Sequence, residues 1–455
     1  MPRKILLVYA PFCMPTVMPY STSYLKGFLS NNLNVDVHCL DLNAKFHRMR
    51  FPQFYERLGR TGDMLSQGEL LSEFDAAARP LYAENNKRVV NNAQPELYKE
   101  LLSAILDKNP DIVAFSIVYS SQCFYALALI NALKKKGVNC VAGGPAVSSK
   151  IGAHVRCMKN EVELLQYAAE KFGGDCKKFE GKAHNCSTVP DFSDYNKDDY
   201  LTKDIVIPVK TCSTCFYKQC AFCAHFADVA YLEYDLENIK RTIVKSGARS
   251  FFFIDDMITK QRLMEIAAMM KPLKVRWWCQ LRPTKDLLGS FKELYDSGLR
   301  SICWGIESGN QRILDLMKKG TIVEDIKSVL KESHEAGIKN TAYIMFGFPG
   351  ETKAEFLDTI NFLKNNDANI DLVSPSIFGL QKRSAIYKNP GTFGITNITT
   401  EKRTVLDERI SYKVEAEMDR EYAKKMRGKY IKMIRKINKL PRAFAAYKEQ
   451  VLVYS

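Results

Sequence analysis

The sequence lacks several features that would identify whole classes of protein. No apolar run approaches the roughly 20 residues of a bilayer-crossing helix, and MPRKILLVYAPF has only a short apolar stretch before a proline, too little for a secretory signal. Cysteine is sparse for a disulfide scaffold, with 13 in 455 residues. There is no internal repeat or low-complexity tract. We therefore expect a soluble, cytoplasmic protein with reduced thiols and no membrane span.

Acidic residues are missing where basic ones are most concentrated. The net charge is +15 at pH 7, and the stretch KKMRGKYIKMIRKINKLPR, from Lys424 to Arg442, holds nine basic residues and no acid. Such a run is usually the solvated face of a helix; the alternative is a dock for an acidic partner such as a peptide leader, a reductase or nucleic acid. Because no aromatic platform or nucleic-acid motif accompanies the run, we do not expect a nucleic-acid partner.

The first third of the chain alternates short apolar runs with helical patterns. Continuous hydrophobicity indicates strands that are covered on both faces. The runs lie at residues 4–10, 35–42, 111–119 and 139–145. They predict a Rossmann-like, doubly wound α/β domain over residues 1–155, with a helical insertion at about 47–108. Ligands of such sheets bind beyond the carboxyl ends of the strands.

A second alternation predicts a partial (β/α)6 TIM-like barrel over residues 205–395. Its apolar runs lie at residues 205–210, 249–255, 275–281, 300–306, 341–347 and 371–378. Polar or special residues follow each run, and active sites of barrels collect at the carboxyl ends of the strands. Residues 156–204 read as a connector, and residues 396–455 as a basic, helical C-terminal region. The predicted fold class is α/β.

The stretch TCSTCFYKQCAFC holds four cysteines, Cys212, Cys215, Cys220 and Cys223, as C-x2-C-x4-C-x2-C. Two zinc knuckles need C-x2-C pairs separated by roughly 15 to 20 residues, so four intervening residues do not suit zinc. The spacing is also not that of a bacterial ferredoxin. What remains is an iron–sulfur cluster held by three thiolates, in which one iron keeps an open coordination position.

This loop resembles the cluster loop of the radical S-adenosylmethionine (SAM) enzymes, C-x3-C-x2-C with an aromatic residue before the last cysteine. The spacing here is one residue longer and is similar to that of cobalamin-dependent members. The resemblance implies a [4Fe-4S] cluster on Cys215, Cys220 and Cys223, with Cys212 outside the ligand set; Cys212 in place of Cys215 is the alternative.

The resemblance continues through FIDDMI, GIESGNQRILDLMKKGT and YIMFGFPGET. It implies that SAM is contacted by Phe222, Asp255, Asp256, Arg282, Glu307, Ser308, Met345, Phe346 and Gly347. Plainer roles stay open: Asp255 as a helix cap, Glu307 as the partner of a lysine, and GFPGE as a turn.

The segments ILLVYAPF, LDLNAKF, PDIVAFSIVYSSQ and VAGGPAV resemble the cobalamin-binding domain that precedes the barrel in one branch of this superfamily. The implied cobalamin contacts are Asp41, Leu42, Asn43, Ser120, Ser121, Gln122, Gly143, Gly144 and Pro145. DVHCLD lacks the glycine of the cobalt-ligating D-x-H-x-x-G motif, so His38 is not expected to bind cobalt. A scaffold domain without a ligand is the alternative.

Together these likenesses imply a cobalamin-dependent radical SAM C-methyltransferase. Its cofactors would be a [4Fe-4S] cluster, SAM and cobalamin, and it would methylate an unactivated carbon through a 5′-deoxyadenosyl radical and methylcobalamin. A cyclase or rearrangement enzyme with the same parts, and a non-enzymatic corrinoid or electron carrier, are the alternatives. We expect a small-molecule or peptide substrate and an electron donor such as flavodoxin or ferredoxin. No catalytic side chain is assigned.

Overall fold

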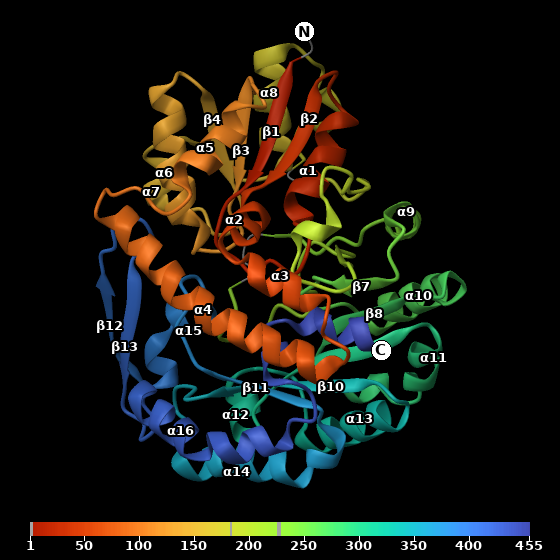
Figure 1. The fold of residues 1–455 in the computed structure, drawn as a ribbon. Coiled ribbons are helices and arrows are strands. Elements are labelled where there is room, and N and C mark those ends of the chain that lie inside the picture. Colours follow the sequence, from red (N-terminus) through yellow and green to blue (C-terminus); the bar gives the residue numbers. More distant parts are fainter. Residues whose placement is uncertain (1–2, 183, 225–228) are drawn as a thin grey trace.

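Two parallel β-sheets organise the chain (Figure 1). The computed structural model describes residues 3–182, 184–224 and 229–455. The first sheet has the strand order β2-β1-β3-β4-β5, and the second has the order β11-β10-β9-β8-β7-β6. Neighbouring strands in both sheets are parallel. The predicted α/β class, with a doubly wound unit followed by a partial barrel, is confirmed.

Helices cover both faces of the first sheet. Its strands are β1 (Lys4–Tyr9), β2 (Asp36–Asp41), β3 (Ile112–Ser116), β4 (Asn139–Gly143) and β5 (Arg156–Met158). One face packs on α1 (Tyr20–Ser30) and α8 (Glu161–Phe172). The other packs on α2 (Leu42–Arg50), α3 (Pro52–Leu58), α4 (Met64–Val90), α5 (Tyr98–Leu106) and α6 (Gln122–Lys135). Helices α2 to α5 are the predicted insertion between the second and third strands.

The first sheet extends beyond the boundary that the sequence suggested. Strand β5 pairs with β4, and α8 packs on the sheet, so residues 156–172 continue this unit instead of forming a connector. Strand β5 escaped prediction because three residues are too few to show a hydrophobic pattern. After α7 (Ser149–Gly152) and α8, the chain contains only the 3₁₀ turns η1 (Lys177–Phe179) and η2 (Lys197–Asp199) before the second sheet, within the residues that the structure describes.

The second sheet curves as an open barrel with its helices outside (Figure 1). Its strands are β6 (Val206–Val209), β7 (Ser250–Phe253), β8 (Arg276–Leu281), β9 (Leu299–Glu307), β10 (Lys339–Phe346) and β11 (Leu372–Ile377). The helices are α9 (Leu236–Ser246), α10 (Lys260–Met270), α11 (Phe291–Asp296), α12 (Gln311–Leu316), α13 (Val323–Glu335) and α14 (Lys353–Asn365), with the turns η3 (Lys271–Leu273), η4 (Lys285–Leu287) and η5 (Asp367–Asn369). Outward residues such as Trp277, Cys279 and Leu281 build the main core against these helices.

The C-terminal region begins with strands and not with a helix. After α15 (Ala385–Lys388) and η6 (Pro390–Phe393), strands β12 (Ile395–Glu401) and β13 (Arg409–Val414) form an antiparallel hairpin. The β-branched run ITNITTE explains this departure from the predicted helix. Most of the basic run lies on α16 (Arg420–Ile437), largely on its exposed side, which agrees with a solvated helix face. None of the helices in the described parts of the chain has both the length and the apolar composition for crossing a membrane.

The last residues of the chain fill part of the concave face of the barrel. The turns η7 (Arg442–Ala445) and η8 (Lys448–Tyr454) follow α16. Leu452 is fully buried and packs with Val206, Trp278 and Cys303, whose side chains point to the inside of the sheet. Helix α4, the long orange helix across the front of Figure 1, covers η7 and contributes to the same core as Phe444 and Tyr447. The C-terminal segment therefore belongs to both units.

Truncating this anchor tests its contribution. Leu452→Ala should lower the free energy of unfolding by about 2 to 5 kcal/mol, because it leaves a cavity against the inner face of the sheet. The midpoint of thermal unfolding, read by circular dichroism, measures the loss. Leu65→Ala is the matched control, since Leu65 is 64% exposed and its truncation should cost within about 0.5 kcal/mol. Equal midpoints for the two variants would contradict the packing of η8 inside the barrel.

Candidate functional site

The loops at the carboxyl-terminal edge of the first sheet contact the second unit. Thr16, in the loop after β1, donates a hydrogen bond of 2.7 Å to Glu449 in η8. Tyr200 donates to the Asp41 carboxylate, at the end of β2, over 2.9 Å. Met18 and Ala44 from the loops of the first sheet belong to the core cluster of the second. Since ligands of parallel sheets bind at carboxyl-terminal edges, the candidate regions are this edge of the first sheet and the rim of the barrel at the carboxyl ends of its strands.

The cysteine loop follows β6 and is held at two points. At its start, the Tyr234 N–H donates to the backbone carbonyl of Thr211, and the Ser213 N–H donates to the backbone carbonyl of Leu232. Further along, Ala221 N–H donates to the carbonyl of Met317, and the Ala221 carbonyl accepts from Ile386 N–H over 3.0 Å. The residues between these points carry Cys215 and Cys220, and Cys220 lies near Arg282 and Glu307, at the ends of β8 and β9.

Cys212 is committed to the start of the loop. Its backbone N–H donates to Asp255 Oδ1 over 2.9 Å, and its thiol lies 3.4 Å from the same oxygen. Thr211 donates to both carboxylate oxygens, through its N–H and its hydroxyl, each over 2.8 Å. Burial, reinforced by the Asp255 carboxylate, raises the pKa of the Cys212 thiol. A thiol held in this way is disfavoured as a thiolate ligand.

The other three cysteines carry half-buried thiols on one loop. Among the residues that the structure describes, no three His, Cys, Asp or Glu side chains lie close enough to hold a metal ion. Burial raises the pKa of the Cys220 thiol, and the nearby Lys319 ammonium opposes that rise. Three thiols with a cation beside them suit an iron–sulfur cluster in their chemistry, so Cys215, Cys220 and Cys223 stay the predicted ligands.

Lys319 brings several predicted site residues together. Its ammonium donates to Glu307 Oε1 over 2.9 Å, and both side chains are nearly buried, at 10% and 12% exposed. The same ammonium lies 5.7 Å from the centre of the Phe222 ring. Arg282 donates to the Lys319 carbonyl and lies 3.6 Å from the centre of the Tyr217 ring. Glu307 thus has a lysine partner, the plainer role that the sequence left open, and still stands beside the cysteine loop.

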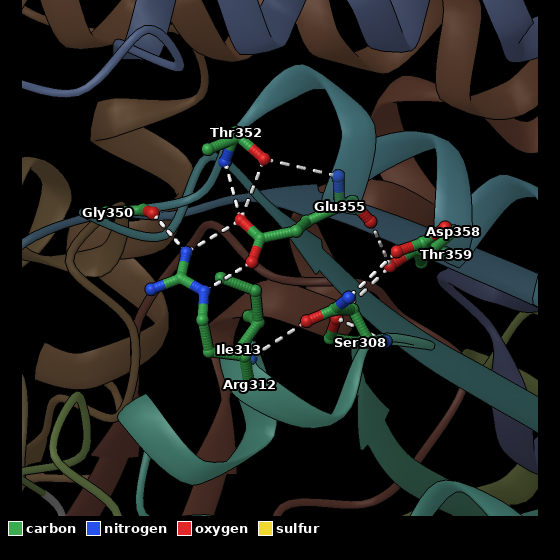
Figure 2. A network of polar contacts seen from close by, with 9 residues as sticks. Ser308, Arg312, Ile313, Gly350, Thr352, Glu355, Asp358 and Thr359 are labelled. Atoms are coloured by element: carbon green, nitrogen blue, oxygen red, sulfur yellow. Dashed lines mark hydrogen bonds and ion pairs between the residues drawn. The ribbon is translucent and has the colours of Figure 1, made fainter.

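A polar network ties the loops after β9 and β10 (Figure 2). Arg312 donates to Gly350 O and to both oxygens of Glu355, which also accepts from Thr352 N–H over 2.9 Å. The Ser308 hydroxyl lies 3.1 Å from that of Thr359 and is fully buried. The side chain of Ser308 therefore positions the loop, and the structure does not bring it to the rim where Glu307 lies.

The remaining predicted SAM contacts divide between the faces of the barrel. Met345 packs beside Phe222 and Ala221. Phe346 points outward, with its ring 4.5 Å from that of Phe356 on α14. The Asp255 carboxylate is used by the cysteine loop, whereas Asp256 is exposed. The side chains of Asp255, Ser308 and Phe346 therefore make structural contacts in this chain, and their roles in binding SAM stay predictions.

Gly347 and Glu351 form a buried pair of backbone and side chain. Gly347 has a φ of +73° and its N–H donates to Glu351 Oε2 over 2.5 Å. Glu351 is fully buried and its second oxygen, Oε1, has no hydrogen-bond partner among the described residues. Burial raises the pKa of Glu351 to about 8, so the carboxyl is protonated in the folded protein near neutral pH.

The predicted cobalamin contacts also divide into buried and accessible residues. The buried ones support the loops: Asn43 accepts from Cys13 N–H over 2.9 Å, and Gln122 donates to Ala10 O over 2.7 Å. Asp41 caps α2 through Ala44 N–H, and Leu42 is fully buried. Those exposed or half-buried at the edge are Ser120, Ser121, Gly143, Gly144 and Pro145.

Gly144 shows why this edge needs glycine. Its φ is +116°, and an added Cβ would stand 2.3 Å from the carbonyl oxygen of Ile117. The loops after β3 and β4 can therefore approach each other only without a side chain at this position. His38 lies on the edge strand β2 and is exposed.

Two residues at the site escaped the sequence analysis. Lys319 stands in the quoted segment GIESGNQRILDLMKKGT, where only burial distinguishes it from Lys318. Tyr119 follows β3 in the quoted SIVYSSQ and is 53% exposed at the edge of the first sheet. The available signal for Tyr119 was a large aromatic residue next to the polar residues that follow the strand.

Comparison with known proteins identifies the second unit. Residues 209–363 match the Radical SAM superfamily. An uncharacterized methyltransferase of Pyrococcus horikoshii is 24% identical over 324 residues, which span 62% of this chain and 71% of the relative. A probable threonylcarbamoyladenosine tRNA methylthiotransferase of Methanocaldococcus jannaschii is 23% identical over 319 residues, 62% of this chain and 72% of the relative. This chain therefore contains a radical SAM domain.

Two solved structures share the fold of nearly the whole chain. TsrM, a radical S-adenosylmethionine methyltransferase from Kitasatospora setae with tryptophan substrate and a SAM analogue bound, has a TM-score of 0.65 at 12% identity, over 98% of this chain and 95% of that chain. The cobalamin-dependent S-adenosylmethionine radical enzyme OxsB has a TM-score of 0.63 at 13% identity, over 94% of this chain and 66% of that chain. The predicted resemblance to cobalamin-dependent radical SAM methyltransferases is confirmed at the level of the fold.

Removing one partner of the buried Glu307–Lys319 pair should be strongly destabilising. Glu307→Gln leaves the Lys319 ammonium buried without a counter-charge and should cost about 3 kcal/mol, measured by thermal or urea unfolding. Adding Lys319→Met should recover part of the loss, because no buried charge remains. Glu324→Gln is the control, because Glu324 forms an exposed ion pair of 2.6 Å with Lys327. Its loss should lower the free energy of unfolding by less than about 1 kcal/mol. A loss no larger than that of the control would contradict the buried pair.

Glu351 should make stability depend on pH. Its pKa is raised from the ordinary 4.5 to about 8, so the folded state holds a proton that the unfolded state releases between these values. Stability relative to Glu351→Gln should therefore be highest at acid pH and fall by about 1.4 kcal/mol per pH unit as pH rises through this window. Unfolding midpoints of both proteins across the window test this. The exposed Glu335→Gln should show no such trend; a flat difference for Glu351→Gln would refute the buried, protonated carboxyl.

Proposed function

We propose that this chain is a cobalamin-dependent radical SAM enzyme that methylates an unactivated carbon of its substrate through a 5′-deoxyadenosyl radical and methylcobalamin. The radical SAM domain and the fold shared with TsrM and OxsB support the enzyme class. One solved structure of TsrM has cobalamin and a [4Fe-4S] cluster bound, and the same groups are proposed for this chain.

One observation carries the proposal. The four cysteines of the loop are unequal, because Cys212 is fully buried on Asp255 whereas Cys215, Cys220 and Cys223 are half-buried near the open rim of the barrel. A cluster held by these three thiolates keeps one iron open, and an open position is what distinguishes a reactive metal site from a structural one.

The residues around the loop would hold SAM. The Glu307 carboxylate, positioned by Lys319, faces the loop and can accept from an amino or hydroxyl group. Met345 and Phe222 give an apolar surface for the adenine, and Asp256 is the accessible acid at the end of β7. When bound, the cluster supplies one electron to SAM, and methylcobalamin supplies the methyl group. The protein contributes position and exclusion of water.

The edge of the first sheet would hold the cobalamin. The accessible residues Ser120, Ser121, Gly144 and Pro145, with Tyr119 beside them, offer hydroxyls, backbone groups and one aromatic ring to a flat macrocycle. This edge contacts η8, which packs on the inner face of the barrel, so a group bound there would be close to the second unit. An acidic electron donor such as flavodoxin or ferredoxin is the proposed partner for reduction.

The cysteine assignment is tested by iron content. After anaerobic reconstitution, Cys215→Ala, Cys220→Ala and Cys223→Ala should each lose the cluster, seen as loss of bound iron, of the visible charge-transfer absorbance and of 5′-deoxyadenosine formation. Cys212→Ala should retain cluster and product, although it should be less stable because a buried thiol is lost. Retention of iron by Cys215→Ala with its loss from Cys212→Ala would overturn the ligand set.

Product mass separates the alternatives. Methyl transfer predicts a product larger than its substrate by one methylene, with the label carried over from methyl-labelled SAM. Cyclisation or rearrangement predicts unchanged or hydrogen-depleted product without the label. A corrinoid or electron carrier predicts no cleavage of SAM by the dithionite-reduced protein. Absence of 5′-deoxyadenosine from protein that holds a full complement of iron and sulfide would reject the proposal.

A further inference from the structure

The C-terminal segment is fixed firmly in the concave face of the barrel. Gln450 is fully buried and its Oε1 accepts from Gln67 on α4 over 2.7 Å and from Thr202 over 3.0 Å. Glu449 accepts from Thr16 and from Gln450 Nε2 over 3.0 Å. These contacts connect η8 to the first sheet, the long helix and the chain that enters β6. The residue just before them, Lys448, is therefore held in a defined place.

Lys448 presents its ammonium to the inside of the barrel. The Lys448 Nζ atom lies 4.2 Å from the centre of the Tyr343 ring, and Tyr343 belongs to the inner face of β10. Lys448 is half-buried and forms no ion pair with any residue in the described ranges. The nearest acid along the chain, Glu449, is engaged by Thr16 and Gln450. Burial raises the pKa of Glu449, which further weakens it as a counter-charge.

A second hydrogen-bond donor of the same inner cluster lacks an acceptor. The indole N–H groups of Trp277 and Trp304 donate to Ser297 O over 3.1 Å and to Asn340 Oδ1 over 2.8 Å. The Trp278 side chain is 7% exposed and packs on the inner face with Tyr343, but its Nε1 has no partner among the described residues. Buried donors of this kind are normally satisfied, so their partner is expected to be a ligand.

The inner face above these residues is open. Gln280, Tyr343, Met345 and Ser374 point inward and are half-buried, whereas their neighbours Leu281, Ala342, Ile344 and Val373 are buried in the outer core. Side chains from central strands of a sheet keep such exposure only where nothing covers them. The half-buried Lys448 side chain is therefore within reach of a molecule of modest size on this face, and the buried Trp278 N–H lies in the cluster beneath it.

We propose that Lys448 binds an anionic group of the substrate, most simply a carboxylate, on the inner face of the barrel, with Trp278 as a second donor. The inference rests on the proposed function, because it presupposes that the chain binds and converts a substrate. A cation without a counter-ion, packed on the Tyr343 ring of a cluster that also holds an unpaired N–H, selects an acceptor that carries negative charge. Substrates with a free acid group would bind, and their amides or esters would bind weakly.

Matched acids and amides test this without knowledge of the natural substrate. The probes are acetate, benzoate and 3-phenylpropionate, each with its primary amide, titrated by ligand-observed NMR into the full-length, reconstituted protein. At least one acid should bind about tenfold or more tightly than its amide, which corresponds to about 1.4 kcal/mol. Lys448→Met should reduce that preference to within about twofold, and Lys448→Arg should keep it.

Lys432→Met is the control, because Lys432 is an exposed lysine on α16 and its loss should leave the preference unchanged. Thermal unfolding of each variant checks that the fold is retained. The proposal is overturned if the wild-type protein prefers none of the acids over its amide, or if Lys448→Met keeps the preference. Cleavage of SAM by the wild-type protein reports separately on the proposed function, so either idea can fail while the other stands.

Discussion

The carboxylate of Asp255 is the constraint on which the arrangement of the site depends. Both of its oxygens accept hydrogen bonds from the first two residues of the cysteine loop. A buried carboxylate is costly unless it is satisfied, and three donors from Thr211 and Cys212 satisfy this one. By fixing Cys212 at the end of β6, the interaction decides which thiols reach the rim. The next fixed point of the loop is Ala221.

Segments that look like recognition motifs prove to combine two tasks. In GIESGNQR, Glu307 faces the cysteine loop while Ser308 and Arg312 tie two loops together. In YIMFGFPGET, Met345 faces inward, whereas Phe346 packs on α14 and Glu351 binds the Gly347 N–H. Alternation along a strand requires this division, since successive side chains point to opposite faces. A motif therefore locates a site more reliably than it assigns a role to each residue.

Much of the fold was predictable because continuous apolar strands and amphipathic helices leave strong local signals. The cysteine spacing also marked the loop, since no common zinc or ferredoxin pattern fits it. Other features depend on contacts between distant parts of the chain. Strand β5 has only three residues, the insertion of Leu452 among inner-face residues joins the end of the chain to β6 and β8, and Lys319 becomes distinctive only once the barrel buries it beside Glu307. No local pattern encodes such contacts.

The central claim is an iron atom without a fourth protein thiolate, and electron paramagnetic resonance tests it most directly. Protein reconstituted without air and reduced with dithionite is measured before and after addition of SAM. The account predicts that SAM changes the g-values and line shape of the reduced [4Fe-4S] cluster, because SAM coordinates the open iron. A cluster spectrum that SAM leaves unchanged would contradict it.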